Sequence, residues 1–170
     1  MENKEKNIFL IGFMGSGKST MARLLAKETG RELIEMDEAI EKEQKMSISD
    51  IFEKYGEQHF RDLESQLIAS ITQKGGAVVS CGGGTVLREQ NVESMKKNGK
   101  VIYLSATAET VYDRVHHSTN RPLLNGNMNV EYITHLMNNR LPIYEKAADN
   151  IICVDKKDKI EILEEMKKCL

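Results

Sequence analysis

The residues that most clearly carry chemistry lie in the segment Gly12–Ser19, which reads GFMGSGKS. A glycine followed after four residues by Gly-Lys-Ser is the spacing of a phosphate-binding P-loop. Its glycines let successive backbone N–H groups point at one anion, and the positive end of the following helix adds to the attraction. We expect Lys18 to reach the β- and γ-phosphates and the Ser19 hydroxyl to ligate a magnesium ion that bridges them. The segment therefore predicts a nucleoside triphosphate site, for ATP with Mg²⁺.

The alternative is a glycine-rich turn that binds nothing. It would require the spacing, the apolar run Ile8–Ile11 before it and the helical pattern after it to coincide by accident. We therefore favour the phosphate site, whose contacts are expected from Gly12, Gly15, Ser16, Gly17, Lys18, Ser19 and Thr20.

Two carboxylates lie at the end of the next apolar run, Leu33–Met36. Glu35 is within the run, and Asp37 follows it directly. If the strand continues to this point, alternation places both on one side, where they can meet a metal and a substrate. The alternative is an ordinary helix start, with Asp37 as the N-cap. The segment alone does not decide between the two.

Two arginines lie beside apolar helical stripes. Arg61 has Glu64 three residues on, which predicts either a surface ion pair or a guanidinium held rigid for a substrate carboxylate. Arg140 falls on the same side as Met137, and an arginine on a buried side needs an anion. The alternative to burial is that the Arg140 side chain lies along the edge of the apolar stripe and keeps its charged end in solvent.

The elements that must position these residues form an α/β pattern. Five apolar runs alternate with helical segments, and nearly continuous apolar runs indicate parallel strands buried on both faces. Ligands of such sheets bind beyond the carboxyl ends of the strands. The five predicted strands are Ile8–Ile11, Leu33–Met36, Ala77–Cys81, Val101–Leu104 and Ile151–Val154.

Three further segments lie at or beyond that edge. Residues 37–73 contain two breaks and predict three helices, about 38–45, 48–55 and 57–73, which would form a substrate lobe. The run Gly82–Gly84 follows the third strand and permits close backbone approach to a ligand. Residues 117–127 are polar, contain proline and glycine, and predict a mobile lid.

Composition excludes several classes of protein. The 170 residues fit one domain, 1–170, and a formal net charge of −2 gives no electrostatic footprint for nucleic acid. The charged N-terminus lacks an apolar stretch for export or membrane insertion. Three widely spaced cysteines suggest reduced thiols and not a disulfide framework or zinc site. We expect a cytoplasmic monomer with small-molecule partners, without nucleic acid or membrane.

In order and spacing, these segments resemble those of the shikimate kinases, which belong to the nucleoside-monophosphate-kinase-like P-loop group. The resemblance covers Ile8 to Asn150 and rests on an ordered set that a P-loop alone would not single out. The matching segments are GFMGSGKST at 12–20, Ile51-Phe52, Gly56-Glu57, Phe60-Arg61, Gly82–Gly84, Arg121-Pro122-Leu123-Leu124, and Arg140 with Pro142 and Tyr144.

The resemblance implies a three-layer P-loop kinase fold and transfer of the γ-phosphoryl of ATP to the 3-hydroxyl of shikimate. It implies that Asp37 holds the attacking hydroxyl, that Arg61 and Arg140 grip the substrate carboxylate, and that Arg114 packs against adenine. The remaining implied roles are support of the ring hydroxyls by Gly82, Gly83 and Gly84, a pocket lining by Phe52 and Phe60, and stabilisation of phosphoryl charge by Lys18 and lid Arg121.

One position departs from the family pattern, which usually has Asp-x-Asp after the second strand. Here Glu35 replaces the first aspartate, which reaches magnesium through water. The added methylene moves the carboxylate by about a bond length, so the change concerns the outer shell of the metal.

Two other functions remain open at this point. A gluconate kinase of the same group would also bind a carboxylate substrate. A regulatory module that senses ATP or shikimate without turnover is disfavoured because Lys18, Ser19 and Asp37 are all present.

Overall fold

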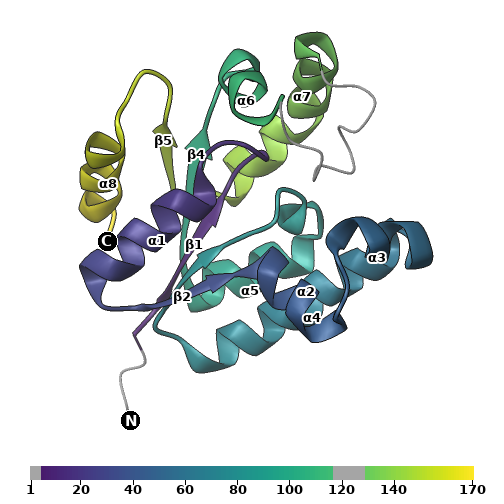
Figure 1. The fold of residues 1–170 in the computed structure, drawn as a ribbon. Coiled ribbons are helices and arrows are strands. Elements are labelled where there is room, and N and C mark those ends of the chain that lie inside the picture. Colours follow the sequence, from purple (N-terminus) through teal and green to yellow (C-terminus); the bar gives the residue numbers. More distant parts are fainter. Residues whose placement is uncertain (1–4, 117–128) are drawn as a thin grey trace.

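A computed structural model describes residues 5–116 and 129–170 of the chain. Its centre is one five-stranded parallel sheet with the strand order β2-β3-β1-β4-β5 (Figure 1). The strands are β1 (Asn7–Ile11), β2 (Glu32–Glu35), β3 (Ala77–Ser80), β4 (Gly99–Ser105) and β5 (Asn150–Cys153). The predicted parallel α/β architecture is confirmed.

The helices follow the predicted order. Helices α2, α3 and α4 are the three expected between the second and third strands, and α7 carries Arg140. Their bounds are α1 (Lys18–Thr29), α2 (Met36–Gln44), α3 (Ile48–Tyr55), α4 (Glu57–Lys74), the short 3-10 helix η1 (Thr85–Leu87), α5 (Glu89–Asn98), α6 (Ala108–Val115), α7 (Val130–Ala147) and α8 (Lys159–Lys168).

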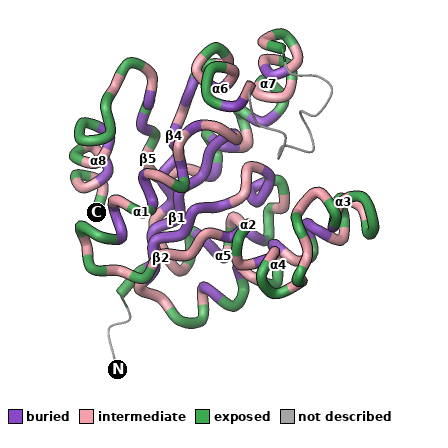
Figure 2. The backbone as a smooth tube through the Cα atoms, in the orientation of Figure 1, coloured by how far each residue is buried: buried purple, intermediate pink, exposed green. Residues whose placement is uncertain are grey.

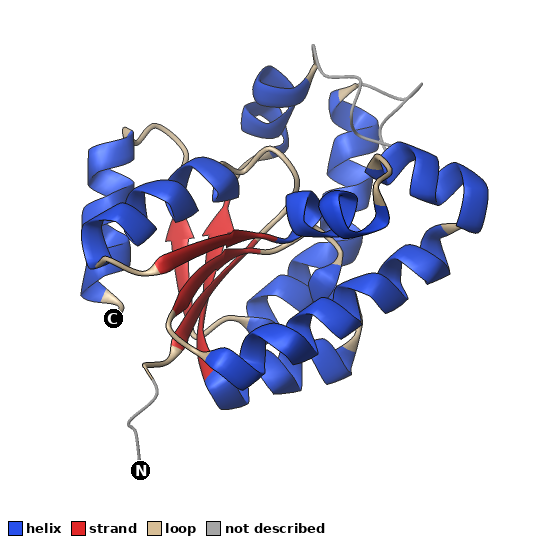
Figure 3. Ribbon diagram, turned by 60° about the horizontal axis from the view of Figure 1, so that its bottom comes forward, coloured by secondary structure: helices blue, strands red, loops and turns tan. Residues whose placement is uncertain are grey.

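The sheet forms the middle of three layers. Helices α1 and α8 cover one face, while α4, α5 and the second half of α7 cover the other (Figures 1 and 3). All residues of β1 and β3 are buried, and Figure 2 shows this buried core running through the centre of the molecule. Burial on both faces explains why these strands are apolar throughout and do not alternate.

The other strands differ from the predicted bounds by one or two residues at an end, but the predicted end of the second strand is wrong in a way that affects the site. Met36 does not end the second strand but begins α2, and Glu35 is the last residue of β2. Asp37 therefore lies in the first turn of a helix, so strand alternation is not what places it near Glu35. A carboxylate in the first turn is favourable because it faces the positive end of the helix dipole.

Asn7 is a polar residue in the core, with no exposed surface. Its side-chain oxygen accepts a hydrogen bond from the Ala77 amide (3.0 Å), and its amide nitrogen donates to the Ile71 carbonyl (3.3 Å). One side chain thus ties the end of α4 and the start of β3 to β1.

We predict that Asn7→Ala will lower the free energy of unfolding by about 1 to 3 kcal/mol, because the buried Ala77 amide loses this acceptor and the Ile71 carbonyl keeps only the Gly75 amide as a donor. Asn139→Ala, at an exposed position of α7, should change it by less than about 0.5 kcal/mol. Chemical denaturation of both variants measures the difference. Equal stability of the two would contradict this role of Asn7.

Candidate active site

One large cavity, of about 760 Å³, opens at the carboxyl edge of the sheet. It collects residues from the P-loop, from α2 to α4, from the segment after β3, and from α6 and α7. The predicted site residues that line it are Gly15, Ser16, Gly17, Lys18, Ser19, Thr20, Glu35, Asp37, Phe52, Phe60, Arg61, Gly82, Gly83, Gly84, Arg114 and Arg140. Gly12 lies at the base of the loop, outside the lining, and Arg121 and predicted lid residues 117–127 lie outside the described residues.

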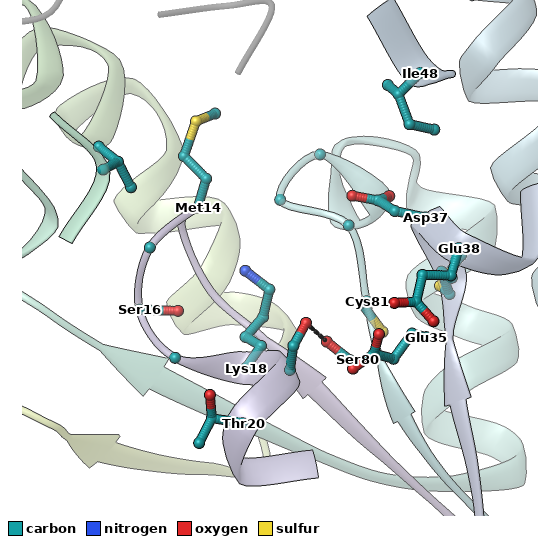
Figure 4. A pocket seen from close by; sticks show the side chains of 18 of the residues that line it. Met14, Ser16, Lys18, Thr20, Glu35, Asp37, Glu38, Ile48, Ser80 and Cys81 are labelled. Carbon is teal, nitrogen blue, oxygen red and sulfur yellow. Dashed lines mark hydrogen bonds between the residues drawn. The ribbon is translucent and has the colours of Figure 1, made fainter. Parts of the chain in front are cut away.

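The P-loop joins β1 to α1 in the predicted way. Gly15 and Gly17 have φ values of 79° and 93°, a region that favours glycine, and α1 begins at Lys18. The Lys18 ammonium donates to the carbonyls of Gly12 (2.8 Å) and Phe13 (3.0 Å). Its side chain points into the cavity across the loop (Figure 4), so its charge lies where the loop amides would hold phosphates.

Arg114 lies against the P-loop from the side of α6. Thr107 caps this helix by accepting a hydrogen bond from the Thr110 amide. The guanidinium of Arg114 is exposed and donates to the Gly15 carbonyl (3.2 Å). A side chain at Gly17 would come within 2.9 Å of the same guanidinium. Arg114 therefore flanks the triphosphate end of the cavity with a planar cation.

The residues around Ser19 fit a hydrated magnesium ion. The Ser19 and Ser80 hydroxyl oxygens are 3.4 Å apart, and Glu35 pairs with Ser80 in the β2–β3 register. The Oε1 atom of Glu35 is buried and accepts no hydrogen bond from residues 5–116 or 129–170, although the Arg23 guanidinium is 3.6 Å away. A metal-bound water would give this oxygen a donor, and Mg²⁺ in proteins usually keeps several waters.

The surroundings of Glu35 disfavour the charged form of its carboxyl group. Burial raises the pKa of its carboxyl above the ordinary value, and the nearby Glu38 carboxyl raises it further. A cation in the cavity would relieve both effects. Among the described residues, no group of three or more His, Cys, Asp and Glu side chains could hold a metal by itself. A magnesium ion at Ser19 would take its other ligands from phosphate and water, as Mg²⁺ commonly does in proteins.

Asp37 lies across the cavity from Lys18, and both side chains point into the space between them (Figure 4). The carboxylate also lies beside the glycine run, because a Cβ atom on Gly82 would be 3.2 Å from its Oδ1 atom. The helix start offered as the alternative is present, but its N-cap is Glu35 and not Asp37, since α2 begins at Met36. Asp37 occupies that first turn and still lines the cavity.

The pair Arg61–Glu64 is buried, so the alternative of a surface ion pair is wrong. Glu64 has no exposed surface and Arg61 is 7% exposed. The Arg61 guanidinium donates to Glu64 (2.6 Å) and Glu57 (3.1 Å), and the Thr85 hydroxyl donates to the other Glu64 oxygen (2.7 Å). The Nε atom of Arg61 is buried and has no hydrogen-bond partner in the described chain. The guanidinium as a whole lines the cavity, where an anionic ligand could meet it.

Electrostatics within this group keep the guanidinium charged. Burial alone would lower the pKa of Arg61, but the Glu64 and Glu57 carboxylates more than offset it and the pKa is raised. Burial raises the pKa of Glu64, against the opposing effects of Arg61 and Thr85. Because Thr85 donates to Glu64, we treat that carboxyl as ionised.

The glycine run packs directly on this pair. A Cβ atom on Gly84 would lie 2.4 Å from the Arg61 guanidinium, and one on Gly82 would lie 2.6 Å from the nearer Glu64 oxygen. Both positions therefore need glycine for space. The backbone of Gly84 itself, at φ −105°, would accept other residues.

Arg140 reaches the same cavity from α7. It is 8% exposed, and its guanidinium lies over the Phe13 ring, 5.7 Å from the ring centre. The predicted burial is confirmed, and the alternative with the charged end in solvent does not hold. Phe52 and Phe60 line the lobe side with ring centres 5.1 Å apart. The acceptor end thus combines two buried cations with an aromatic wall.

Sequence reasoning missed several residues at the cavity. Ser80, the last residue of β3, lines the cavity, and Thr85 supports it from behind through Glu64. Lys157, before α8, and Lys159, the first residue of α8, also line the cavity. Ser80 and Thr85 could have been found by reading both neighbours of the glycine run. The two lysines carry no local signal, because charged residues before a helix are common on protein surfaces.

Comparison with known proteins identifies the family. The family model for shikimate kinase matches residues 14–170. A shikimate kinase of Thermodesulfovibrio yellowstonii is 45% identical over 150 residues, which cover 88% of this chain and 85% of the relative. This chain belongs to the shikimate kinase family.

Solved structures agree with this assignment. A shikimate kinase from Acinetobacter baumannii, solved in complex with shikimate, is 32% identical with a TM-score of 0.92 over 97% of this chain and 92% of that one. A gluconokinase from Sinorhizobium meliloti gives a TM-score of 0.55 at 17% identity over 94% of this chain and 88% of that one. The second likeness reflects the fold alone, so the alternative activity of a gluconate kinase is not favoured for this chain.

We predict that Glu35→Ala will raise the magnesium concentration needed for half-maximal rate and leave shikimate affinity largely unchanged. Glu35→Asp should be nearly neutral, since an outer-shell carboxylate can act at a range of distances. A magnesium titration of the two variants measures this. If Glu35→Ala shifted only thermal stability, Glu35 would serve the fold and not the metal.

We predict that Gly84→Ala will weaken shikimate binding at least about tenfold, because the added methyl group must displace the Arg61 guanidinium and its charged hydrogen bonds. ATP affinity should stay within about twofold, since the P-loop is untouched. Calorimetric titration with each ligand tests the split. Unchanged shikimate affinity would show that Arg61 is not needed at its present place.

Proposed function

We propose that this shikimate kinase transfers the γ-phosphoryl group of ATP to the 3-hydroxyl of shikimate, a step of aromatic amino-acid biosynthesis. One observation carries the proposal. A single cavity has the P-loop on one wall and the buried guanidinium groups of Arg61 and Arg140 on another, with Asp37 lining the same space. Such a cavity can hold a triphosphate and a small carboxylate with one hydroxyl between them.

The nucleotide end is assigned to the P-loop. The backbone amides of residues 12–20 would surround the β- and γ-phosphates, with Lys18 supplying charge as the γ-phosphoryl group leaves. Magnesium would be held by Ser19, with Glu35 accepting a hydrogen bond from one of its waters. When bound, the ion neutralises charge on the β- and γ-phosphates. Arg114, already against Gly15, is assigned to the adenine base.

The acceptor end is assigned to the buried cations. Arg61 and Arg140 would bind the shikimate carboxylate, since both side chains line the cavity. The Gly82–Gly84 backbone would support the ring hydroxyls, while Phe52 and Phe60 would close the pocket around the ring. This arrangement explains why a carboxylic acid with a nearby hydroxyl is the acceptor.

Asp37 is assigned to the attacking hydroxyl. It would accept the hydrogen bond of the 3-hydroxyl and take its proton as the oxygen bonds to phosphorus and ADP leaves. Phosphoryl transfer usually has a loose transition state with little proton transfer, so orientation of the hydroxyl is a large part of this role.

Arg121 and the predicted lid, residues 117–127, complete the proposal. Closure over bound nucleotide would bring the Arg121 charge to the phosphates and exclude water from the γ-phosphate. This part rests on the family resemblance, since these residues lie outside the described ranges.

We also infer that the kinase acts in the cytoplasm as a monomer. All three cysteines have free thiols, which suits a reducing compartment. No helix within the described residues 5–116 and 129–170 is both long and apolar enough to cross a membrane.

The direct experiment is a coupled ADP-release assay with shikimate and gluconate as acceptors. Magnesium- and shikimate-dependent ADP release, with no turnover of gluconate, is the expected result. Turnover of gluconate and not of shikimate would favour the alternative that the protein is a gluconate kinase. Binding of ATP and shikimate without ADP release would indicate a sensing module.

We predict that Asp37→Asn will lower turnover at least about 100-fold, because general acid–base groups typically contribute factors of this size and an amide can neither accept the proton nor orient the hydroxyl as well. ATP affinity should remain nearly intact. Asp50→Asn, an exposed position of α3, serves as the control. Turnover of Asp37→Asn within a few-fold of the unmodified enzyme would remove this residue from the mechanism.

A further inference from the structure

Tyr144 connects two parts of the acceptor site that are far apart in the sequence. It lies on α7 one turn after Arg140 and is 2% exposed. Its ring stacks on that of Tyr103 in β4, with centres 5.1 Å apart and an interplanar angle of 27°. Its hydroxyl donates a hydrogen bond to the Gly83 carbonyl (2.5 Å). The ring thus belongs to the core, while the hydroxyl meets the glycine run.

The carbonyl groups of the glycine run show why this hydroxyl matters. The Gly82 carbonyl accepts from the Thr85 amide (3.2 Å), and the Gly84 carbonyl accepts from the Leu87 amide (3.1 Å). These backbone bonds belong to the turn into η1. The middle carbonyl, that of Gly83, is instead held by Tyr144. One side chain from another layer therefore fixes the central peptide of the run.

Gly83, whose carbonyl Tyr144 holds, also lies close to Arg140. A Cβ atom on Gly83 would be 3.6 Å from the Arg140 Nη1 atom, so α7 and the glycine run approach each other at this point. The opposite side of the run is set by Arg61 and Glu64, against which Gly84 and Gly82 pack. The Tyr144 bond is therefore a hydrogen bond that ties the run to α7.

We infer that Tyr144 is a positioning residue for the phosphoryl acceptor: its hydroxyl locks the Gly83 peptide to α7 and so fixes the distance between the glycine run and Arg140. The inference rests on the proposed function, because it takes the glycine run and Arg140 as the shikimate site. Phenylalanine would fill the same space and stack equally well. Only the hydroxyl performs the positioning.

The chemistry of the phenol suits a constant donor. Burial raises the pKa of Tyr144 to about 12, against an opposing effect of the nearby Arg140 charge. The group therefore stays protonated throughout the neutral range. Because the Gly83 carbonyl is an obligate acceptor, losing the hydroxyl leaves a backbone group short of a partner.

The test compares Tyr144→Phe with Tyr103→Phe. The two rings form one stacked pair, and Tyr103 is equally buried, at 3% exposure, but has no hydrogen bond to the glycine run among the described contacts. We expect Tyr144→Phe to raise the KM for shikimate about three- to tenfold, the size of one lost neutral hydrogen bond, with the KM for ATP within about twofold. Tyr103→Phe should leave both values unchanged.

A second measurement reports on the glycine run without substrate. Hydrogen exchange at the Thr85 and Leu87 amides should be faster in Tyr144→Phe than in Tyr103→Phe. Equal exchange and an unchanged KM for shikimate would overturn the inference, as would equal losses for both substrates. An unmodified enzyme that neither binds nor phosphorylates shikimate would overturn the proposed function, and the role of Tyr144 toward the acceptor with it.

Discussion

The acceptor half of the cavity depends on one buried ion pair. Arg61 and Glu64 are both removed from water, and charges in such a place are tolerated only when they are paired and hydrogen-bonded. Glu64 achieves this through Arg61 and Thr85, but Arg61 keeps one donor without a partner. The glycine run follows from the same constraint, because Gly82 and Gly84 have no space for side chains beside this pair. Folding thus prepares a rigid cation for an anionic ligand.

The parallel sheet explains why this cation and the P-loop line the same cavity. Strands β2, β3 and β1 are neighbours, so the residues that follow them share one edge. Glu35 ends β2 and Asp37 follows it, while the glycine run comes after β3 and the P-loop after β1. Parallel strands bring these segments together although they are distant in sequence. The donor and acceptor ends are therefore held by neighbouring strands of one rigid element, which favours the alignment that phosphoryl transfer needs.

The fold and most of the described site were predictable because their signals are local. A P-loop has fixed spacing, and doubly buried strands are apolar throughout. The burial of Arg61 and Glu64 was not predictable, since helical spacing shows that they can pair but not which segment covers them. The start of α2 at Met36 was missed because an apolar residue fits either a strand end or a first turn. Ser80 and Tyr144 act through partners brought near by the sheet and α7, which no local pattern encodes.

The most direct test of this account is calorimetric titration of the enzyme with shikimate and with its methyl ester, which keeps the ring and hydroxyls but removes the negative charge. If Arg61 and Arg140 bind the carboxylate, the ester should bind roughly ten- to a hundred-fold more weakly, the cost of lost charged hydrogen bonds. Equal affinity for acid and ester would contradict the claim that this buried cation pair selects the substrate.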